Sequence, residues 1–249
     1  MLNASKNLLK LVQKLKISKF RNLEQKFIVE GDKLVLESIQ NIPQEVVTVF
    51  ITNTSKIPKE SISQFDVYQI SNEELDKIST QKNPQHSLAI VKSSFKIKKN
   101  IEQPIILICD GIQDPGNFGT IIRTADWFGI QTIIASENTV DRFNPKVIQA
   151  SMGSIFRVEV SYENLQNYLK GSNRLKIATT LDGGDLFNFE TNVDIALIIG
   201  NEGKGVSSDL LQIVDVKIKI PGFGAAESLN ASVASGIVIA QLKKSMQNA

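Results

Sequence analysis

The sequence predicts an α/β protein with two domains, the larger being a parallel sheet covered by helices in the C-terminal half. A length of 249 residues with 42% hydrophobic residues is enough for two cores. Strand-like apolar runs alternate with helical patterns in both halves, and a lysine-containing stretch separates the halves. We therefore expect an N-terminal domain at residues 1–93, a linker at 94–104 and a C-terminal domain at 105–249.

The N-terminal half is predicted to be a small α/β domain. An opening helix follows from the helical spacing of Leu8, Leu11 and Leu15. Ser71 and Glu74 have the spacing of a capping box, which predicts another helix start. The remaining expected elements are a helix at Asp32–Ile39 and strands at Phe27–Val29, Val46–Thr52, Val67–Ile70 and Ser87–Val91.

The C-terminal half alternates more regularly between apolar strands and helices. Its expected strands are Ile105–Cys109, Thr132–Ala135, Lys176–Thr180, Ile195–Ile199 and Val216–Ile220. Such alternation favours a parallel sheet with helices on its faces. Ligands of such sheets bind at loops that follow the carboxyl ends of strands, so we expect the functional site at those loops.

Composition excludes several classes of protein. The longest apolar runs are far shorter than the roughly 20 residues that cross a bilayer, so no membrane helix is expected. The first residues lack the apolar centre and cleavage site of a signal peptide. The single Cys109 and the single His86 provide neither a disulfide nor a zinc site, so both are expected to be structural, with no metal. A reducing cytoplasm is the expected location.

Positive charge is concentrated in the N-terminal half. Residues 1–100 contain 16 Lys or Arg and 10 Asp or Glu, whereas the remainder contains 12 and 16. Six cations, from Lys6 to Arg21, precede the first acidic residue, Glu24. This cluster is suited to nucleic-acid phosphates, and it is equally compatible with an ordinary solvated helix face.

The first of three unusual motifs runs from Asp114 to Gly129, where a strand leads through a loop into a helix. Asn117 is placed to cap this helix and Gly129 to end it. At about 100° per residue, Arg123 lies about 200° around the helix from Ile121, which belongs to the apolar stripe, and is free to face a ligand. The alternative is a simple cap and an ordinary surface arginine.

The second motif, Ile199–Gly205, follows a buried strand and contains three glycines. Its spacing matches neither the dinucleotide fingerprint nor the phosphate loop, which argues against a nicotinamide-dependent dehydrogenase. A glycine-rich turn alone is weak evidence of function, but Glu202 within it is hard to explain as part of a plain turn.

The third motif, Ile220–Gly236, leads into the last helix. Ser228 resembles a helix N-cap, and small residues suit the helix to close packing. A tightly packed terminal helix explains most of the motif, but it does not explain Ser228 and Asn230 beyond capping. The expected buried stripe of this helix is Leu229, Val233, Gly236, Ile237 and Ala240.

Taken together and in this order, the motifs closely resemble those of the SpoU-type RNA ribose 2′-O-methyltransferases, also called the TrmH family, of the SPOUT superfamily. The resemblance covers about Ile105–Lys243. In the N-terminal half, Phe27–Gly31 and Asn83–Ala89 resemble the substrate-binding domain of many members, which has a ribosomal-protein-like RNA-binding fold.

The resemblance implies S-adenosylmethionine as methyl donor, a C-terminal trefoil knot, and a homodimer whose active site takes residues from both subunits. Catalytic positions carry over to Asn117, Arg123, Glu202, Ser228 and Asn230. Cofactor contacts carry over to Gly200, Ile220 and Leu229, and further to Thr179 and Thr180. Two departures concern Gly222, where the family commonly has a larger apolar residue, and His86, where it often has glycine.

The chemistry of the guanidinium group limits the role that Arg123 can have. The family arginine is often assigned as the base, but a guanidinium stays protonated at ordinary pH. We expect Arg123 instead to bind the adjacent phosphate and to stabilise developing alkoxide charge, while that phosphate or water accepts the proton.

Several alternatives remain for the function. The implied reaction is ribose methylation of RNA, and the appended N-terminal domain favours ribosomal over transfer RNA. Base methylation is the nearest enzymatic alternative, and a noncatalytic RNA-binding or ribosome-assembly protein on the same fold is the alternative from another class. The five polar positions of the motifs argue against loss of catalysis.

Overall fold

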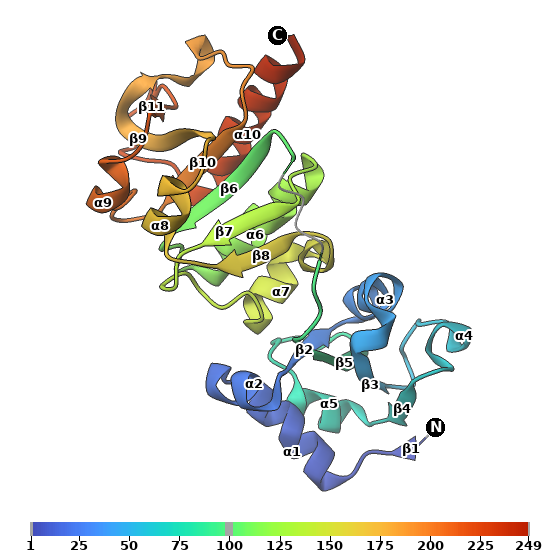
Figure 1. Ribbon diagram of the computed structural model, residues 1–249. Coiled ribbons are helices and arrows are strands. Elements are labelled where there is room, and N and C mark those ends of the chain that lie inside the picture. Colours follow the sequence, from blue (N-terminus) through green and yellow to red (C-terminus); the bar gives the residue numbers. More distant parts are fainter. Residues whose placement is uncertain (1, 98–101, 249) are drawn as a thin grey trace. The chain divides into compact units, whose positions relative to one another are not determined.

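The computed structural model describes residues 2–97 and 102–248, and it divides into two compact units (Figure 1). The N-terminal unit contains the residues up to Ile97 together with Asp141–Phe156, and the C-terminal unit contains the rest. The chain therefore returns to the N-terminal unit from within the C-terminal half before completing the second sheet.

The N-terminal unit is built on a mixed five-stranded sheet with the order β1-β4-β3-β5-β2. Strand β5 is antiparallel to both β2 and β3, whereas β4 is parallel to β1 and β3. Ser71 and Glu74 form the predicted capping box at α5. The elements are β1 (Leu2–Asn3), α1 (Lys6–Leu15), α2 (Ser18–Glu24), β2 (Lys26–Glu30), α3 (Asp32–Asn41), η1 (Pro43–Glu45), β3 (Val46–Ile51), α4 (Lys59–Ile62), β4 (Asp66–Gln69), α5 (Asn72–Ile78) and β5 (Ser87–Lys92).

The segment Asp141–Phe156 completes the core of the N-terminal unit. It contains helix α7 (Pro145–Ser151) and the 3-10 helix η2 (Ser154–Phe156). Arg21 is 4% exposed, and its guanidinium donates two hydrogen bonds to one carboxylate oxygen of Asp141, at 3.0 and 2.6 Å. Phe143 stacks on Phe27 with ring centroids 4.5 Å apart. Residues inserted between two strands of the second sheet thus stabilise the first unit.

The C-terminal unit is an entirely parallel six-stranded sheet with the order β11-β9-β10-β6-β7-β8, as the alternating pattern predicted. The central strands β6 and β10 are buried along their whole length, which explains their unbroken apolar sequence. The elements are β6 (Ile105–Asp110), α6 (Pro115–Trp127), β7 (Thr132–Ala135), β8 (Glu159–Tyr162), α8 (Leu165–Lys170), β9 (Leu175–Asp185), η3 (Leu186–Asn188), β10 (Ile195–Gly200), α9 (Ser208–Leu211), β11 (Val216–Lys219) and α10 (Ala231–Asn248).

Helices cover both faces of this sheet. Leu165, Leu169 and Leu210 of α8 and α9 pack in one core with alternate side chains of β6 and β10. Helices α6 and α10 pack together on the opposite face (Figure 1). No helix in residues 2–97 or 102–248 is long and apolar enough to cross a membrane.

In the N-terminal unit the short strand β1 was not predicted, and two strands of the C-terminal unit differ from the prediction. Strand β8 was not predicted, because Glu159 and Ser161 alternate with only two larger side chains in a run of four residues. Strand β9 continues beyond Thr180 to Asp185, and its pairing with β11 jumps from Ala178 to Gly184. Residues 179–183 therefore bulge out of the ladder. This bulge is where β9 separates from β10.

The predicted linker is partly anchored. Its residues 98–101 lie outside the described part of the chain. Phe95 is buried in the N-terminal unit, with its ring centroid 6.1 Å from that of Phe27. Gln103 is buried in the C-terminal unit, where its side-chain oxygen accepts the main-chain N–H of Gln131 at 2.7 Å.

The predicted apolar stripe of α10 is wrong. The buried residues of the helix are instead Ala231, Ser235, Val238, Ile239, Leu242 and Ser245. Leu229 and Val233 of the predicted stripe are 48% and 51% exposed. The helix has small or apolar residues on two faces, so periodicity could not determine which face packs on the sheet.

Candidate functional site

The loops of the first two motifs begin side by side at the carboxyl edge of the C-terminal sheet. Strands β6 and β10 pair in register to their last residues, so Asp110 lies opposite Gly200. The amide of Asn201 then links the two loops, because its Nδ2 donates to the main-chain oxygen of Gly111 at 2.7 Å.

In the first motif, the helix cap frees a side chain for the site. The Asp114 carboxylate accepts the main-chain N–H of Asn117 at 2.7 Å, so Asp114 is the N-cap and the expectation that Asn117 caps α6 is wrong. Pro115 occupies the first helical turn, where its missing N–H is tolerated, and this places the cap at the preceding residue. The side chain of Asn117 is consequently available for other partners.

Asn117 joins all three motifs. Its Nδ2 donates to Oε1 of Glu202 at 2.9 Å, and its Oδ1 accepts from Nδ2 of Asn230 at 2.8 Å. A carboxylate only accepts hydrogen bonds, so Glu202 determines which way the Asn117 amide faces. Glu202 and Asn230 are exposed and Asn117 is half-buried, so the network is accessible to a polar ligand. We refer to Asn117, Glu202 and Asn230 as the amide–carboxylate network.

In the third motif, Asn230 has the capping role that was predicted for Ser228. The Asn230 side-chain oxygen accepts the main-chain N–H groups of Ser232 at 2.9 Å and Val233 at 3.3 Å. The cap is therefore two residues later than expected, immediately before the first helical residue, Ala231.

Ser232 belongs to the site although the sequence did not single it out as a site residue. Its hydroxyl lies 2.6 Å from Oδ1 of Asn230 and 3.4 Å from Oδ1 of Asn117. The available signal was a hydroxyl at the second position of a helix that follows a capping asparagine. Such a hydroxyl can reach back to the cap.

The glycines of the second motif shape the turn that presents Glu202. Asn201 and Gly205 exchange main-chain hydrogen bonds of 3.0 and 2.9 Å, which close a tight hairpin. A Cβ on Gly200 would lie 2.3 Å from the carbonyl carbon of Gly205, so no larger residue fits there. Gly205 has φ +69°, which favours glycine.

Two predicted catalytic residues are not brought into this network. Arg123 is exposed, and its side chain has no hydrogen bond or ion pair within the described residues. It follows Asn117 by six positions, so it lies about 120° around the helix from Asn117. Ser228 is also exposed and forms no side-chain hydrogen bond within the part of the chain that the structure describes.

Two of the residues expected to contact a cofactor, Thr179 and Thr180, lie at the point where β9 separates from β10. The Thr179 hydroxyl donates to the main-chain oxygen of Ile198 at 3.2 Å, and the Thr180 hydroxyl lies beside the exposed Asp182 carboxyl and lowers its pKa. Ile220 is half-buried and Leu229 is exposed. Hydroxyl groups and accessible apolar side chains are the kinds of group that suit a ligand with both polar and apolar parts, such as S-adenosylmethionine.

The single cysteine is not suited to thiolate chemistry. Burial and the neighbouring Asp110 charge raise the pKa of the Cys109 thiol to about 12, which keeps it protonated at neutral pH. Within residues 2–97 and 102–248, no group of three or more His, Cys, Asp or Glu side chains is arranged to hold a metal ion.

The chain is similar to known proteins in both sequence and structure. The SpoU rRNA Methylase family matches residues 104–240, and an MRM3-like substrate binding domain matches residues 6–89. The chain is 32% identical over 235 residues to the 23S rRNA (guanosine(2553)-2′-O)-methyltransferase RlmP of Bacillus subtilis, covering 93% of this chain and 94% of that protein.

Several solved structures resemble the whole chain, among them the following two. One is a TrmH-family structure from Porphyromonas gingivalis, with a TM-score of 0.83 and 30% identity over 98% of this chain and 99% of that chain. The other is an AdoMet-bound rRNA methyltransferase from Sinorhizobium meliloti, with a TM-score of 0.85 and 25% identity over 98% of this chain and 97% of that chain. The family expected from the three motifs is confirmed: the chain belongs to the SpoU rRNA Methylase family.

Proposed function

We propose that the protein is a methyltransferase that transfers a methyl group from S-adenosylmethionine to a ribose 2′-hydroxyl of ribosomal RNA. The observation that carries the proposal is the amide–carboxylate network, which joins all three family motifs at the carboxyl edge of a parallel sheet. The names of the similar proteins support it, since one is a 23S rRNA 2′-O-methyltransferase and another an AdoMet-bound rRNA methyltransferase.

The reaction forms a bond between the ribose oxygen and the methyl carbon, breaks the bond between that carbon and sulfur, and releases the hydroxyl proton. Bound S-adenosylmethionine supplies a methyl group on a positively charged sulfur, which is a good leaving group. The protein must align the hydroxyl with that methyl group and favour loss of its proton. The network presents a carboxylate acceptor and amide groups that can orient a ribose hydroxyl, and Ser228 would contribute a further hydroxyl.

The cofactor would be held at the bulge of β9 and the neighbouring loops. Thr180 has a hydroxyl beside Asp182, and Leu229 offers exposed apolar surface. Together with Thr179, Gly200 and Ile220, these residues would bind the polar and apolar parts of S-adenosylmethionine. The proposed knot of the C-terminal unit would bring the same loops together.

Arg123 would act in a homodimer. Trp127, one turn further along α6, is 84% exposed, and Val233 of the neighbouring helix α10 is 51% exposed. Large exposed apolar side chains on two packed helices are typical of a protein interface. Burying this surface against a second copy would allow Arg123 of the partner subunit to reach the amide–carboxylate network. Its guanidinium would bind a phosphate and stabilise developing negative charge.

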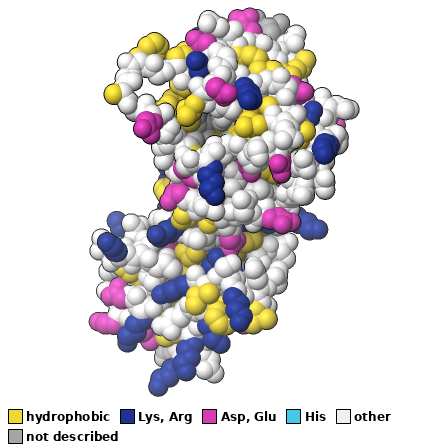
Figure 2. Space-filling view, turned by 90° about the vertical axis from the view of Figure 1, so that its left-hand side faces the viewer, with side chains coloured by type: hydrophobic (Ala, Val, Ile, Leu, Met, Phe, Trp, Pro, Cys, Tyr) yellow, Lys and Arg dark blue, Asp and Glu magenta, His cyan; other side chains and the backbone are white. Residues whose placement is uncertain are grey.

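The N-terminal unit would bind the RNA, consistent with its match to a substrate binding domain. Lys6, Lys10 and Lys14 are exposed on α1, and Figure 2 shows several Lys and Arg side chains on one face of this unit. We assign RNA binding to residues 1–93, linkage to 94–104 and methyl transfer to 105–249. Ribosomal RNA is preferred over transfer RNA, and the proposed location is the cytoplasm.

Ribosomal RNA from cells that lack the protein tests the proposal. Incubation with the protein and S-adenosylmethionine should restore one ribose methylation, identified by nuclease digestion and nucleoside mass spectrometry. A deoxyribose at the target position should abolish the product, because the 2′-hydroxyl is the acceptor. A methylated base would indicate base methylation instead, and failure to bind S-adenosylmethionine in calorimetry would favour a noncatalytic RNA-binding protein.

A further inference from the structure

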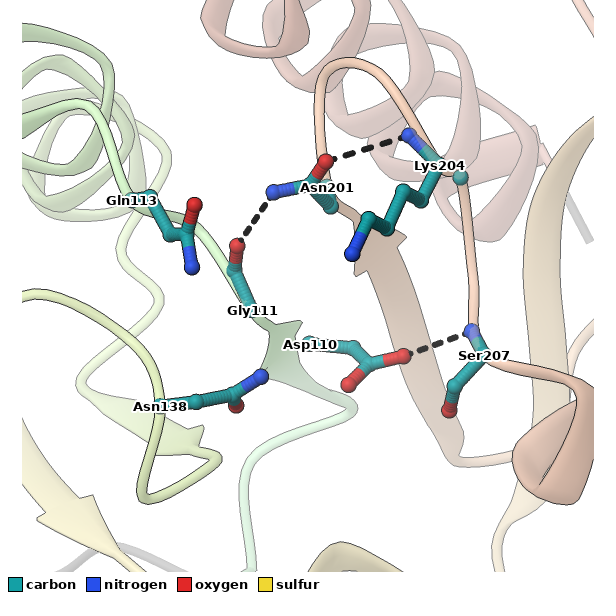
Figure 3. A pocket seen from close by; sticks show the side chains of 8 residues that line it. Asp110, Gly111, Gln113, Asn138, Asn201, Lys204 and Ser207 are labelled. Carbon is teal, nitrogen blue, oxygen red and sulfur yellow. Dashed lines mark hydrogen bonds between the residues drawn. The ribbon is translucent and has the colours of Figure 1, made fainter.

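A cavity of about 140 Å³ lies beside the amide–carboxylate network (Figure 3). It is formed by the loops that follow β6, β7 and β10. The lining residues are Asp110, Gly111, Gln113, Asn138, Asn201, Lys204, Gly205 and Ser207. In the sheet, β6 and β7 lie on one side of β10, whereas β9 and β11 lie on the other. The cavity is therefore distinct from the proposed cofactor position at the β9 bulge.

The cavity floor contains a buried carboxylate. Asp110 is 9% exposed, and its Oδ2 accepts the main-chain N–H of Ser207 at 2.7 Å. A carboxylate has acceptor positions on both oxygens, so this single hydrogen bond within the described chain leaves Oδ1 available. Buried charge requires further polar partners, which a ligand with N–H donors would supply.

Hydrogen-bond donors surround this carboxylate. In Figure 3, Lys204 points back from its loop into the space between Asn201 and Asp110, and Gln113 approaches from the other side. The side chains of Lys204, Gln113 and Asn138 make no hydrogen bond or ion pair within the described residues. The cavity therefore offers a carboxylate, an ammonium group and two amide side chains that the fold does not use.

The wall of the cavity is held in place by the fold. Asn201 donates to Gly111, and its Oδ1 accepts the main-chain N–H groups of Gly203 and Lys204 at 3.0 and 3.1 Å. Within the described residues, every hydrogen bond of the Asn201 side-chain amide either joins the two loops or closes the hairpin. Asn201 consequently shapes the cavity, while Asp110 and Lys204 supply its recognition chemistry.

Size and position indicate which part of the RNA fits. Pockets for drug-sized ligands occupy roughly 300–1,000 Å³, so about 140 Å³ suits one ring system better than a complete nucleotide. Asn201 lines the cavity and the next residue, Glu202, belongs to the network. A ribose at the network would thus place its attached base at the cavity.

We propose that this cavity binds the base of the methylated nucleotide and selects guanine. The inference rests on the proposed function, because it requires the acceptor ribose at the amide–carboxylate network. Guanine presents N1–H and N2–H donors beside the O6 acceptor, which match the Asp110 carboxylate and the Lys204 ammonium. Adenine and cytosine place an amino group where guanine has O6, and uracil has only one ring N–H for Asp110. Mismatched donors would leave buried polar groups unpaired, which gives selectivity.

The first test measures the product and the rate. With S-adenosylmethionine and ribosomal RNA from cells lacking the protein, the full-length enzyme should form 2′-O-methylguanosine. Asp110→Asn and Lys204→Met should each lower kcat/KM by about 5- to 150-fold, the range expected for one good base contact, with unchanged affinity for S-adenosylmethionine. Lys170→Met, which changes an exposed lysine at the end of α8, is the matched control and should leave kcat/KM unchanged.

The second test identifies the contact. In a synthetic RNA spanning the mapped site, inosine replaces the target guanosine and removes only the N2 amino group. Wild-type enzyme should prefer guanosine, and Asp110→Asn should reduce that preference, because the carboxylate that accepts from N2–H is gone. Lys204→Met should slow both substrates similarly, since inosine retains O6.

The outcomes separate this inference from the proposed function. Methylation of a different nucleoside, or an unchanged guanosine-to-inosine ratio in Asp110→Asn, would refute the guanine pocket while leaving ribose methylation intact. If the wild-type enzyme methylates no RNA, the proposed function fails. Binding of guanine at the cavity is then tested separately by NMR titration with guanosine monophosphate and adenosine monophosphate. Selective perturbation of Lys204 and Asn138 signals by the guanine nucleotide supports the pocket, and equal or absent perturbation overturns it.

Discussion

Asn117 donates a 2.9 Å hydrogen bond to Glu202, a residue 85 positions further along the chain. The contact joins the start of helix α6 to the hairpin after β10, and Asn230 joins it from the start of α10. The relationship exists because Asp114 caps α6 and leaves the Asn117 amide available.

Changing Asn117 to Asp should severely reduce methyl transfer. The substitution replaces an amide donor with a carboxylate that repels Glu202, so the network loses its geometry. A misplacement of about 1 Å costs on the order of 100-fold in rate, and we expect at least that loss in single-turnover methylation. Asn167→Asp, at an exposed asparagine of α8, is the matched control. A near-normal rate for Asn117→Asp would remove the network from the mechanism.

Arg123 variants test whether the active site is shared between subunits. Arg123→Ala and Asn117→Asp homodimers should both be inactive. When the two variants are mixed and their subunits exchange randomly, roughly half of the dimers contain one subunit of each variant. Each such dimer has one site with both Asn117 and Arg123 intact, so roughly a quarter of wild-type activity should return. Subunit exchange, measured with differently tagged copies, is the necessary control. No recovery after complete exchange would place both residues in one subunit's site.

Arg123→Lys separates a guanidinium role from simple positive charge. Lysine keeps the charge but loses the planar fork that binds a phosphate through two parallel hydrogen bonds. We expect a slower single-turnover reaction with unchanged affinity for RNA. Retention of a near-normal rate would show that the guanidinium has no specific role.

The exposed apolar surface of α6 and α10 should be required for dimerisation. Val233→Glu introduces a charge beside this surface, where desolvation would oppose association. Sedimentation should show a shift from dimer to monomer. Leu23→Glu changes a residue of the N-terminal unit that is 72% exposed, and it should leave the assembly unchanged. A wild-type protein that sediments as a monomer would exclude the proposed homodimer.

Arg21→Ala should destabilise the N-terminal unit. It removes the ion pair with Asp141 and leaves the main-chain oxygens of Leu15 and Lys16 without the guanidinium that donates to them. Because Asp141 keeps partial exposure to water, we expect a loss of about 3 kcal/mol, at the lower end for a broken buried pair. The loss of stability is measured by hydrogen exchange, which should become faster for the amides of α1 and β2. Lys19→Ala, at an exposed position of α2, should have little effect.

The sequence alone determined that the C-terminal unit is a parallel sheet with helices, and it determined the positions of the important loops. Apolar runs such as Ile195–Ile199 are too short for a membrane helix and are spaced by helical patterns, which leaves a parallel sheet as the consistent solution. The order of the three motifs was sufficient to identify the family. These features are local or periodic, so they can be read without knowing which segments meet.

Tertiary structure decided which side chains perform each role. Asp114 rather than Asn117 caps α6, and Asn230 rather than Ser228 caps α10, although all four residues are of types that can act as caps. The choice depends on where the chain enters each helix. The face of α10 that packs on the sheet was likewise undetermined, because both of its faces contain small or apolar residues.

The sequence also did not show that the segment Asp141–Phe156 belongs to the N-terminal unit. Sequence order places it within the C-terminal half, but Arg21 and Phe27 bind Asp141 and Phe143 and draw it into the N-terminal core. Such contacts join residues more than a hundred positions apart. Their free energy comes from burial and paired charge in three dimensions, which no local pattern in the sequence records.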